Sequence, residues 1–169
     1  VIMYINIIFM SIFLGYSIGS APIVSYHYGA GNHVELKNLF HKSLTFLMIS
    51  GVLLLVASEA LARPLSAIFV NYDAALLDLT VRGFRIYSLA FLIMGINVWG
   101  SSFFTALNNG LVSAIISFLR TLVFQIIVIM VLPALLGVDG IWFSIAAAEV
   151  MALFVTIGFL FTNRGKYHY

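Results

Sequence analysis

The 169-residue sequence contains no cysteine, only three prolines and very few charges. Without cysteine the chain can form neither disulfides nor thiolate metal sites, so the sequence leaves its redox compartment open. Only 8% of the residues are charged, whereas a soluble domain carries about 25%. Such a chain has too few charges to cover a surface that faces water. The formal net charge of +2 is spread along the sequence and gives no indication of a nucleic-acid partner.

Hydrophobic residues make up 63% of the chain and gather in long runs. A bilayer core about 30 Å thick is crossed by about 20 apolar residues in a helix. Because backbone groups in lipid need internal partners, and because the runs are too long for barrel strands, we predict an all-α membrane protein. It forms one bundle over residues 1–162, followed by a short polar tail at 163–169. The five predicted transmembrane helices cover approximately residues 1–26, 39–62, 84–107, 111–133 and 141–162.

The first residue, Val1, lies inside an apolar run that no basic residue precedes. A signal peptide would start with a basic segment and end at a small-residue cleavage site. We therefore expect the sequence to be part of a longer chain, and to begin within or just before a membrane helix.

The connections between the predicted spans differ in length and charge. Residues 108–110, "NNG", form a very short turn at Gly110, which predicts a tight antiparallel hairpin of the third and fourth spans. The longest connection, residues 63–82, alternates leucines with acids in a pattern that suits a short helix in the membrane interface. Four basic residues on one side of the membrane oppose three on the other, which weakly favours a cytoplasmic location for the first side. The four are Lys37, Lys42, Arg164 and Lys166, and the three are Arg63, Arg82 and Arg85.

Two charged residues, Arg120 and Glu149, lie deep inside predicted spans. At 1.5 Å per residue, Arg120 is roughly 13 Å from one membrane surface and Glu149 roughly 12 Å from the other. In a core about 30 Å thick the two antiparallel positions fall within about 5 Å of the same level, so we predict that they approach one another, directly or through water. A charge at this depth costs on the order of 2.5–3.5 kcal/mol and indicates a functional site. The alternative is that Arg120 extends to the membrane surface and Glu149 is a packed, hydrogen-bonded or protonated acid.

Asn97 and Gln125 are amides near the middle of the third and fourth spans. Each could line an aqueous path or donate a hydrogen bond to a neighbouring helix, and the second is the commoner outcome for a lone amide. Together with Arg120 and Glu149, they are the candidates for a substrate or ion pathway.

The sequence carries no catalytic motif of the common hydrolases or nucleotide-binding enzymes. His27, His33 and His41 lie near one predicted membrane surface, but their spacing fits no metal-binding template. We therefore expect neither an enzyme nor a metal site, and no cofactor apart from a coupling ion, H⁺ or Na⁺.

Residues 26–32, "YHYGAGN", interrupt the apolar chain between the first two predicted helices. Pro22 is expected to kink the first helix or loosen its last turns. Gly29 and Gly31 allow the positive φ values that end a helix, and Asn32 can cap the next one. The segment is therefore predicted to be a compact turn.

This turn, with Gly15, Gly19 and Pro22 upstream, resembles that of the multidrug and toxic compound extrusion (MATE) transporters. Three further segments are similar to motifs of that family and follow in the same order, so the resemblance spans essentially the whole chain. They are "FRIYSLAF" (84–91), "FFTALNNG" (103–110) and "GIWFSIAAAEV" (140–150).

The resemblance implies helices eight to twelve of a twelve-helix transporter with two six-helix lobes. It implies that the turn at residues 26–32 and the tail at 163–169 face the cytoplasm. Family members export organic cations and other amphipathic compounds in exchange for protons or sodium ions, by rocking of the two lobes. The partners implied are the bilayer of the plasma (inner) membrane, the seventh helix, the N-terminal lobe and small organic cations. Without the other lobe, this part of the transporter is expected to be inactive.

Two departures from the family pattern bear on the candidate residues. Some members place an acidic cation-site residue where counting back from "ALNNG" gives Asn97, which cannot ionise. Relatives often have a proline shortly before the acid of the last helix, where this chain has "SIAAAE". Two other functions stay open. A flippase for lipid-linked oligosaccharides would show several basic residues along a central cavity. A structural membrane protein without transport would tolerate Glu149→Gln combined with Arg120→Gln.

Overall fold

The computed structural model describes residues 2–169, which are almost entirely helical. Two long helices, α1 (Ile2–Gly29) and α2 (His33–Val70), come first. A pair of shorter helices follows, α3 (Ala74–Ser88) and α4 (Phe91–Ala106). The next run is continuous and consists of α5 (Gly110–Phe118), the π-helix η1 (Leu119–Phe124) and α6 (Gln125–Leu136). The last helix is α7 (Val138–Tyr167).

Four of these segments are long and apolar enough to cross a membrane: α1, α2, the run α5–η1–α6, and α7. The helices α3 and α4 make a fifth span when they are counted as one helix bent by 48°. The protein is therefore an all-α integral membrane protein, as the sequence predicts. Large apolar side chains on α1, α2 and α6 are exposed, as expected of surfaces that face lipid.

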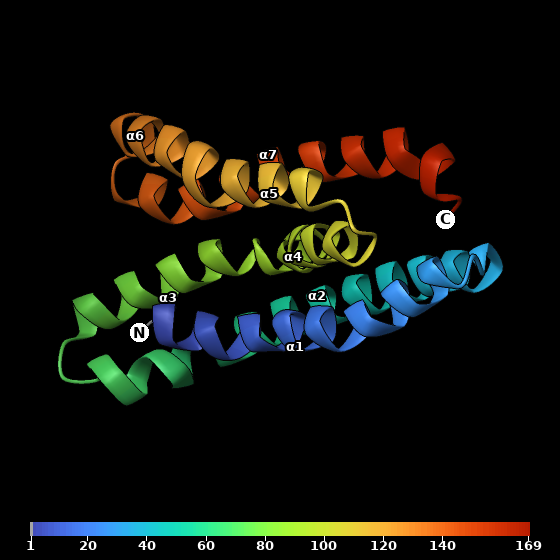
Figure 1. Cartoon of the computed structure of the whole chain (residues 1–169). Helices are drawn as coiled ribbons and strands as arrows, with labels where there is room; N and C mark the ends of the chain where they lie inside the picture. The colour runs from blue at the N-terminus through green and yellow to red at the C-terminus, as the bar shows by residue number, and fades with distance from the viewer. Residues whose placement is uncertain (1) are drawn as a thin grey trace.

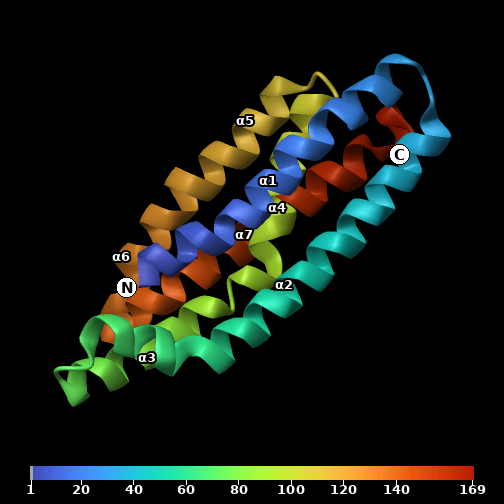
Figure 2. The same cartoon turned by 90° about the horizontal axis from the view of Figure 1, so that it is seen from below.

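Helix α4 occupies the centre of the bundle and packs against α1, α2, α5 and α7. Figure 1 shows α1 and α2 on one side of the α3–α4 pair, with the α5–α6 run and α7 on the other. The long helices run side by side in the perpendicular view, and the first described residues lie at the opposite end of the bundle from the C-terminus (Figure 2). In keeping with this central position, every residue from Met94 to Gly100 is buried.

The helix boundaries differ from the prediction between residues 62 and 91. The second helix does not end at 62 but continues through Pro64 to Val70, so the connection of 63–82 is not a separate interfacial helix. Asp73 then caps α3 by accepting hydrogen bonds from two backbone N–H groups at 2.9 and 3.1 Å. The third span therefore starts at Ala74 rather than at 84. The physical reason is that α3 has an apolar face of its own, which packs against α2 and α7.

Glycines permit two close backbone approaches that position the core. A Cβ at Gly51 of α2 would lie 2.9 Å from the carbonyl oxygen of Phe91, so glycine lets α2 pass directly beside the bend between α3 and α4. A Cβ at Gly140 of α7 would lie 2.3 Å from the carbonyl oxygen of Leu132 in α6. Both contacts are with backbone atoms, which cannot move aside as a side chain can.

The turn at residues 26–32 is compact, but its two glycines differ. Gly31 has a positive φ of 66°, whereas Gly29 is simply the last residue of α1 and has no positive φ, contrary to the prediction. Asn32 caps α2, because its Oδ1 accepts from the backbone N–H of Glu35 at 3.2 Å. Pro22 lies inside α1, which continues unbroken on both sides of it.

The second short turn uses asparagine rather than glycine for the left-handed conformation. Asn108 has a φ of 59°, and Gly110 is the first residue of α5. Asn109 caps α5 by accepting from the backbone N–H of Val112 at 3.3 Å. Its Nδ2 donates to the Tyr167 hydroxyl at 2.9 Å, which ties this turn to the end of α7.

The polar residues at 163–169 continue the last helix as far as Tyr167. Tyr169 is also buried, and its hydroxyl donates to the backbone carbonyl of Leu160 at 2.9 Å.

Candidate functional site

The carboxylate of Glu149 in α7 is held by two side chains from two other segments. Arg120, in the π-helix η1, places its Nε 2.9 and 3.0 Å from the two carboxylate oxygens and its Nη2 2.7 Å from Oε1. Asn97 of α4 donates from Nδ2 to Glu149 Oε2 at 2.8 Å and to the Glu149 backbone carbonyl at 2.9 Å. The structure therefore brings Arg120 and Glu149 into direct contact, as their depths predict, and adds Asn97 to the pair.

This cluster is shielded from its surroundings. The side chains of Arg120 and Glu149 are 13% and 8% exposed, and Asn97 is fully buried. Two opposite charges at such a site partly neutralise one another, and the hydrogen bonds satisfy both carboxylate oxygens. Removing one partner would leave the other charge uncompensated, which is the costly situation in a medium of low dielectric constant.

The helix that carries Arg120 changes its hydrogen-bonding pattern at this residue. Residues 119–124 form a π-helix within the otherwise α-helical span α5–η1–α6. A π turn inserts an extra residue per turn, so it shifts the direction in which side chains leave the helix, and such turns are frequent at functional sites. Here the turn carries Arg120 towards Glu149 on α7.

A chain of hydrogen-bonded hydroxyls joins α4 and α5 beside the cluster. Thr105 Oγ1 donates to Ser113 Oγ at 2.7 Å, Ser113 Oγ lies 2.9 Å from Ser101 Oγ, and Ser101 Oγ lies 2.7 Å from Ser117 Oγ. The chain begins at Thr105, the next-to-last residue of α4, and ends at Ser117, about one turn before Arg120. These hydroxyls are absent from the predicted site.

A cleft of about 270 Å³ opens between α1, α4 and the α5–η1 run, and we call it the polar cleft because six polar residues share its otherwise apolar lining. Two of its polar atoms, Ser17 Oγ and Asn97 Oδ1, are buried without a hydrogen-bond partner in the part of the chain that the structure describes. The cleft therefore connects the space beside α1 with the arginine that pairs with Glu149. Its polar lining residues are Ser17, Asn97, Ser101, Ser102, Ser117 and Arg120.

Gln125, the fourth candidate from the sequence, stands apart from this cluster. It begins α6, is half-buried, and its side chain forms no hydrogen bond with residues 2–169. The three histidines near one end of the bundle also have separate surroundings. His33 packs edge-to-face on His168 with ring centroids 5.0 Å apart, His41 Nδ1 lies 2.8 Å from the Lys37 carbonyl, and His27 belongs to α1.

The chain is similar to one known protein family and to two solved structures. The model of the MatE family matches residues 1–131. A solved structure described as the inward-facing conformation of a multidrug resistance MATE family transporter of the MOP superfamily superimposes with a TM-score of 0.89. It is 17% identical, and the match covers 98% of this chain and 39% of that one. The Vibrio cholerae MATE transporter VcmN in its bent form gives a TM-score of 0.86 at 15% identity, with the same coverage. None of the curated proteins compared with this chain matches it. The chain thus corresponds to about two fifths of the length of the solved transporters.

Proposed function

We infer, since this chain belongs to the MatE family of transporters, that it forms most of one lobe of a secondary active transporter. Its helices correspond to helices eight to twelve of a twelve-helix protein. The seventh helix and the N-terminal lobe are then its partners within the complete transporter. Alternating access works by motion of one half against the other around a shared site, so this lobe alone transports nothing.

The complete transporter exports organic cations in exchange for protons or sodium ions across the plasma (inner) membrane. The description of one solved transporter, as a multidrug resistance transporter, supports the drug-export part of this proposal. The coupling part rests on one observation, the buried cluster of Arg120, Glu149 and Asn97 beside a polar cleft. Charged residues inside a membrane typically mark ion pathways or proton relays.

In the proposed coupling step, Glu149 exchanges its ion pair with Arg120 for a proton or a sodium ion. A protonated Glu149 is neutral and holds the guanidinium less strongly than the carboxylate does. Arg120 also lines the polar cleft, so its release changes the charge that the cleft presents to a cationic substrate. Antiport requires a site whose two states bind different partners. One state binds the coupling ion, and the other admits the substrate.

The test is efflux of a fluorescent organic cation from cells that express the complete parent transporter, wild type against Glu149→Gln. Efflux is normalised to the amount of protein in the membrane. The matched control is Glu59→Gln, which removes an exposed acid. Glu59 pairs with Arg85 at 3.4 Å, and this pair lies near the end of the bundle opposite the Asn108 turn. We expect gradient-dependent efflux to be lost in Glu149→Gln and kept in Glu59→Gln.

Other outcomes assign the cluster differently. Equal efflux from wild type and Glu149→Gln would reduce the pair to a packing role and shift the coupling site to the other lobe. If even the wild type exports no cation, the flippase or structural alternatives become the better description.

A further inference from the structure

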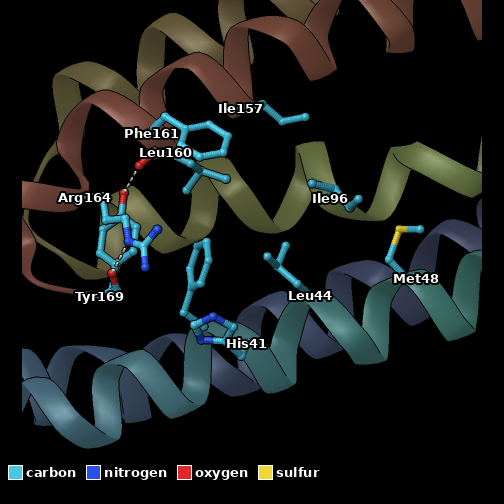
Figure 3. Close-up of a pocket in the computed structure, with 10 residues that line it drawn as sticks. His41, Leu44, Met48, Ile96, Ile157, Leu160, Phe161, Arg164 and Tyr169 are labelled. Atoms are coloured by element: carbon cyan, nitrogen blue, oxygen red, sulfur yellow. Dashed lines mark hydrogen bonds between the residues drawn. The ribbon is translucent and has the colours of Figure 1, made fainter.

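A second cleft, separate from the polar one, opens between α2 and α7 with α4 as its floor (Figure 3). Its volume is about 320 Å³, and almost all of its lining is apolar. Leu44 and Met48 line it from α2, Ile96 from α4, and Ile157 and Phe161 from α7. The Arg120–Glu149 cluster contributes none of the lining residues.

Two basic side chains stand at one end of this apolar cleft, His41 on α2 and Arg164 on α7. His41 Nδ1 lies 2.8 Å from the Lys37 carbonyl, which can only accept, so Nδ1 donates and this contact fixes the imidazole ring at the rim. Arg164 donates from Nε to the Tyr169 carbonyl at 3.2 Å, which holds the guanidinium at the rim. Burial raises the pKa of the Tyr169 phenol, so this wall of the cleft adds no negative charge.

The rim belongs to a patch of uncompensated positive charge. The same end of the bundle carries three more exposed basic residues, Lys37 and Lys42 on α2 and Lys166 on α7, and one exposed acid, Glu35, in the described part of the chain. The other end of the bundle is different, since each of its three arginines is paired with an acid. Those pairs are Arg63–Asp78, Arg82–Asp139 and Arg85–Glu59. Within residues 2–169, no ion pair involves a basic residue of the patch.

The dimensions of the cleft restrict what can occupy it. An α-helix with its side chains is about 10 Å wide, a cross-section of about 80 Å², so 320 Å³ holds less than one helical turn. An acyl chain is narrow enough to fill such a space, and each buried CH₂ group contributes about 0.8 kcal/mol. An amphipathic organic cation would also fit by shape, but the Arg164 guanidinium at the rim would repel its charge.

We propose that this cleft binds an anionic phospholipid, with one acyl chain between α2 and α7 and the phosphate against Arg164. Basic pockets between transmembrane helices at a membrane surface are suited to anionic head groups. The lipid occupies a site distinct from the polar cleft, so its binding does not depend on the transport mechanism proposed above.

The test is native mass spectrometry of the complete parent transporter, titrated with equal amounts of palmitoyl-oleoyl phosphatidylglycerol and phosphatidylcholine. The first retained lipid is expected to be phosphatidylglycerol. A basic residue near an anionic head group contributes about 1 kcal/mol, so Arg164→Gln should weaken that binding about fivefold. The control, Arg63→Gln, removes another exposed positive charge, at the other end of the bundle, and should leave the preference unchanged.

The acyl-chain part of the proposal has its own variants. Leu44→Trp fills the cleft from α2, and Ile157→Trp fills it from α7 at a more exposed position, in case the first variant fails to fold. Both keep the rim charges and should reduce retention of phosphatidylglycerol. Glycerol 3-phosphate, which has the phosphate but no acyl chain, should not compete at the concentrations used.

Three results would each overturn the proposal. One is an unchanged preference for phosphatidylglycerol in Arg164→Gln. Another is an equal loss in Arg63→Gln, which would show that any surface charge acts alike. The third is a lack of any acyl-chain requirement, seen as full retention in both tryptophan variants or as competition by glycerol 3-phosphate, since the occupant would then be a phosphate and not a lipid.

Discussion

A double-mutant cycle on Arg120 and Glu149 tests the energetic meaning of the buried pair. The changes are Arg120→Gln, Glu149→Gln and both together in the complete transporter. The carboxylate uses both of its oxygens, accepting from Arg120 on each and from Asn97 on Oε2. A glutamine at this position offers one acceptor oxygen, so it can satisfy only one of these two neighbours fully.

The burial of the pair sets the expected magnitude. With side chains 13% and 8% exposed, each single change leaves a charge without its partner in a region of low dielectric constant. Breaking a buried pair in this way typically costs about 3–5 kcal/mol of folding free energy. The double change leaves two neutral amides, which can hydrogen-bond to one another, so its cost should be well below the sum of the two single costs. We expect a coupling energy of at least about 2 kcal/mol.

The control cycle uses Glu59 and Arg85, whose nearest charged atoms are 3.4 Å apart. Their side chains are 43% and 55% exposed. Exposed ion pairs contribute about 0.2–1 kcal/mol, so this cycle should give a coupling energy within that range.

The free energy of unfolding is measured by denaturant titration in mixed micelles for all variants of both cycles. A coupling energy for Arg120 and Glu149 no larger than that of the exposed pair would refute the reasoning. It would mean that water reaches the pair freely, and that the site is not an enclosed ion pair.

Three further predictions concern packing, capping and the hydroxyl chain. Gly140→Ala should cost about 1–3 kcal/mol of stability, because the added Cβ would meet the Leu132 backbone. The control Gly158→Ala places its Cβ in open space and should be neutral or stabilising, so equal unfolding free energies of the two variants would contradict this prediction. Asn109→Ala removes a helix cap and should cost about 1 kcal/mol in the same measurement, and a loss below about 0.3 kcal/mol would show that the cap is dispensable. Ser101→Ala breaks the hydroxyl chain at its middle and should slow proton-driven efflux of the complete transporter, with unchanged efflux counting against a proton path.

The sequence is sufficient to predict the class of fold and the central pair. Five apolar runs predict the spans, because span length depends only on bilayer thickness and helical rise. The same arithmetic places Arg120 and Glu149 at one depth, and the short connection at Gly137, between α6 and α7, makes their spans antiparallel. These two facts predict that the side chains approach one another, directly or through water, and the structure shows that the contact is direct.

The remainder of the site depends on rotation about the helix axes, which hydropathy does not fix. Asn97 and Gln125 look alike in the sequence, since each is a lone amide in a span, yet only Asn97 faces Glu149. The π turn around Arg120 has no signature in its apolar neighbours, and it changes the facing of every residue that follows. Ser113 and Ser117 stand four residues apart, which is typical of close packing, and only the position of α4 makes them part of a hydroxyl chain.

The boundary errors have a different physical origin. Residues 63–82 contain charges and a proline, which normally end a membrane helix. The charges are instead accommodated by ion pairs such as Arg63–Asp78 at 3.8 Å, which lie at the surface of the bundle and let α2 and α3 extend beyond the apolar core.

The bend between α3 and α4 divides the central span into two helical segments that point in different directions. In a continuous helix, changing the angle between the two halves requires breaking hydrogen bonds of the backbone ladder. Here the direction already changes by 48° at Leu89–Ala90. Gly51 has no side chain, so α2 packs closely against the backbone at this bend. A change in tilt of α3 can therefore be absorbed by a few dihedral angles at the corner. Asn97, which holds Glu149, lies on the α4 side of the corner, and α3 lies on the other side.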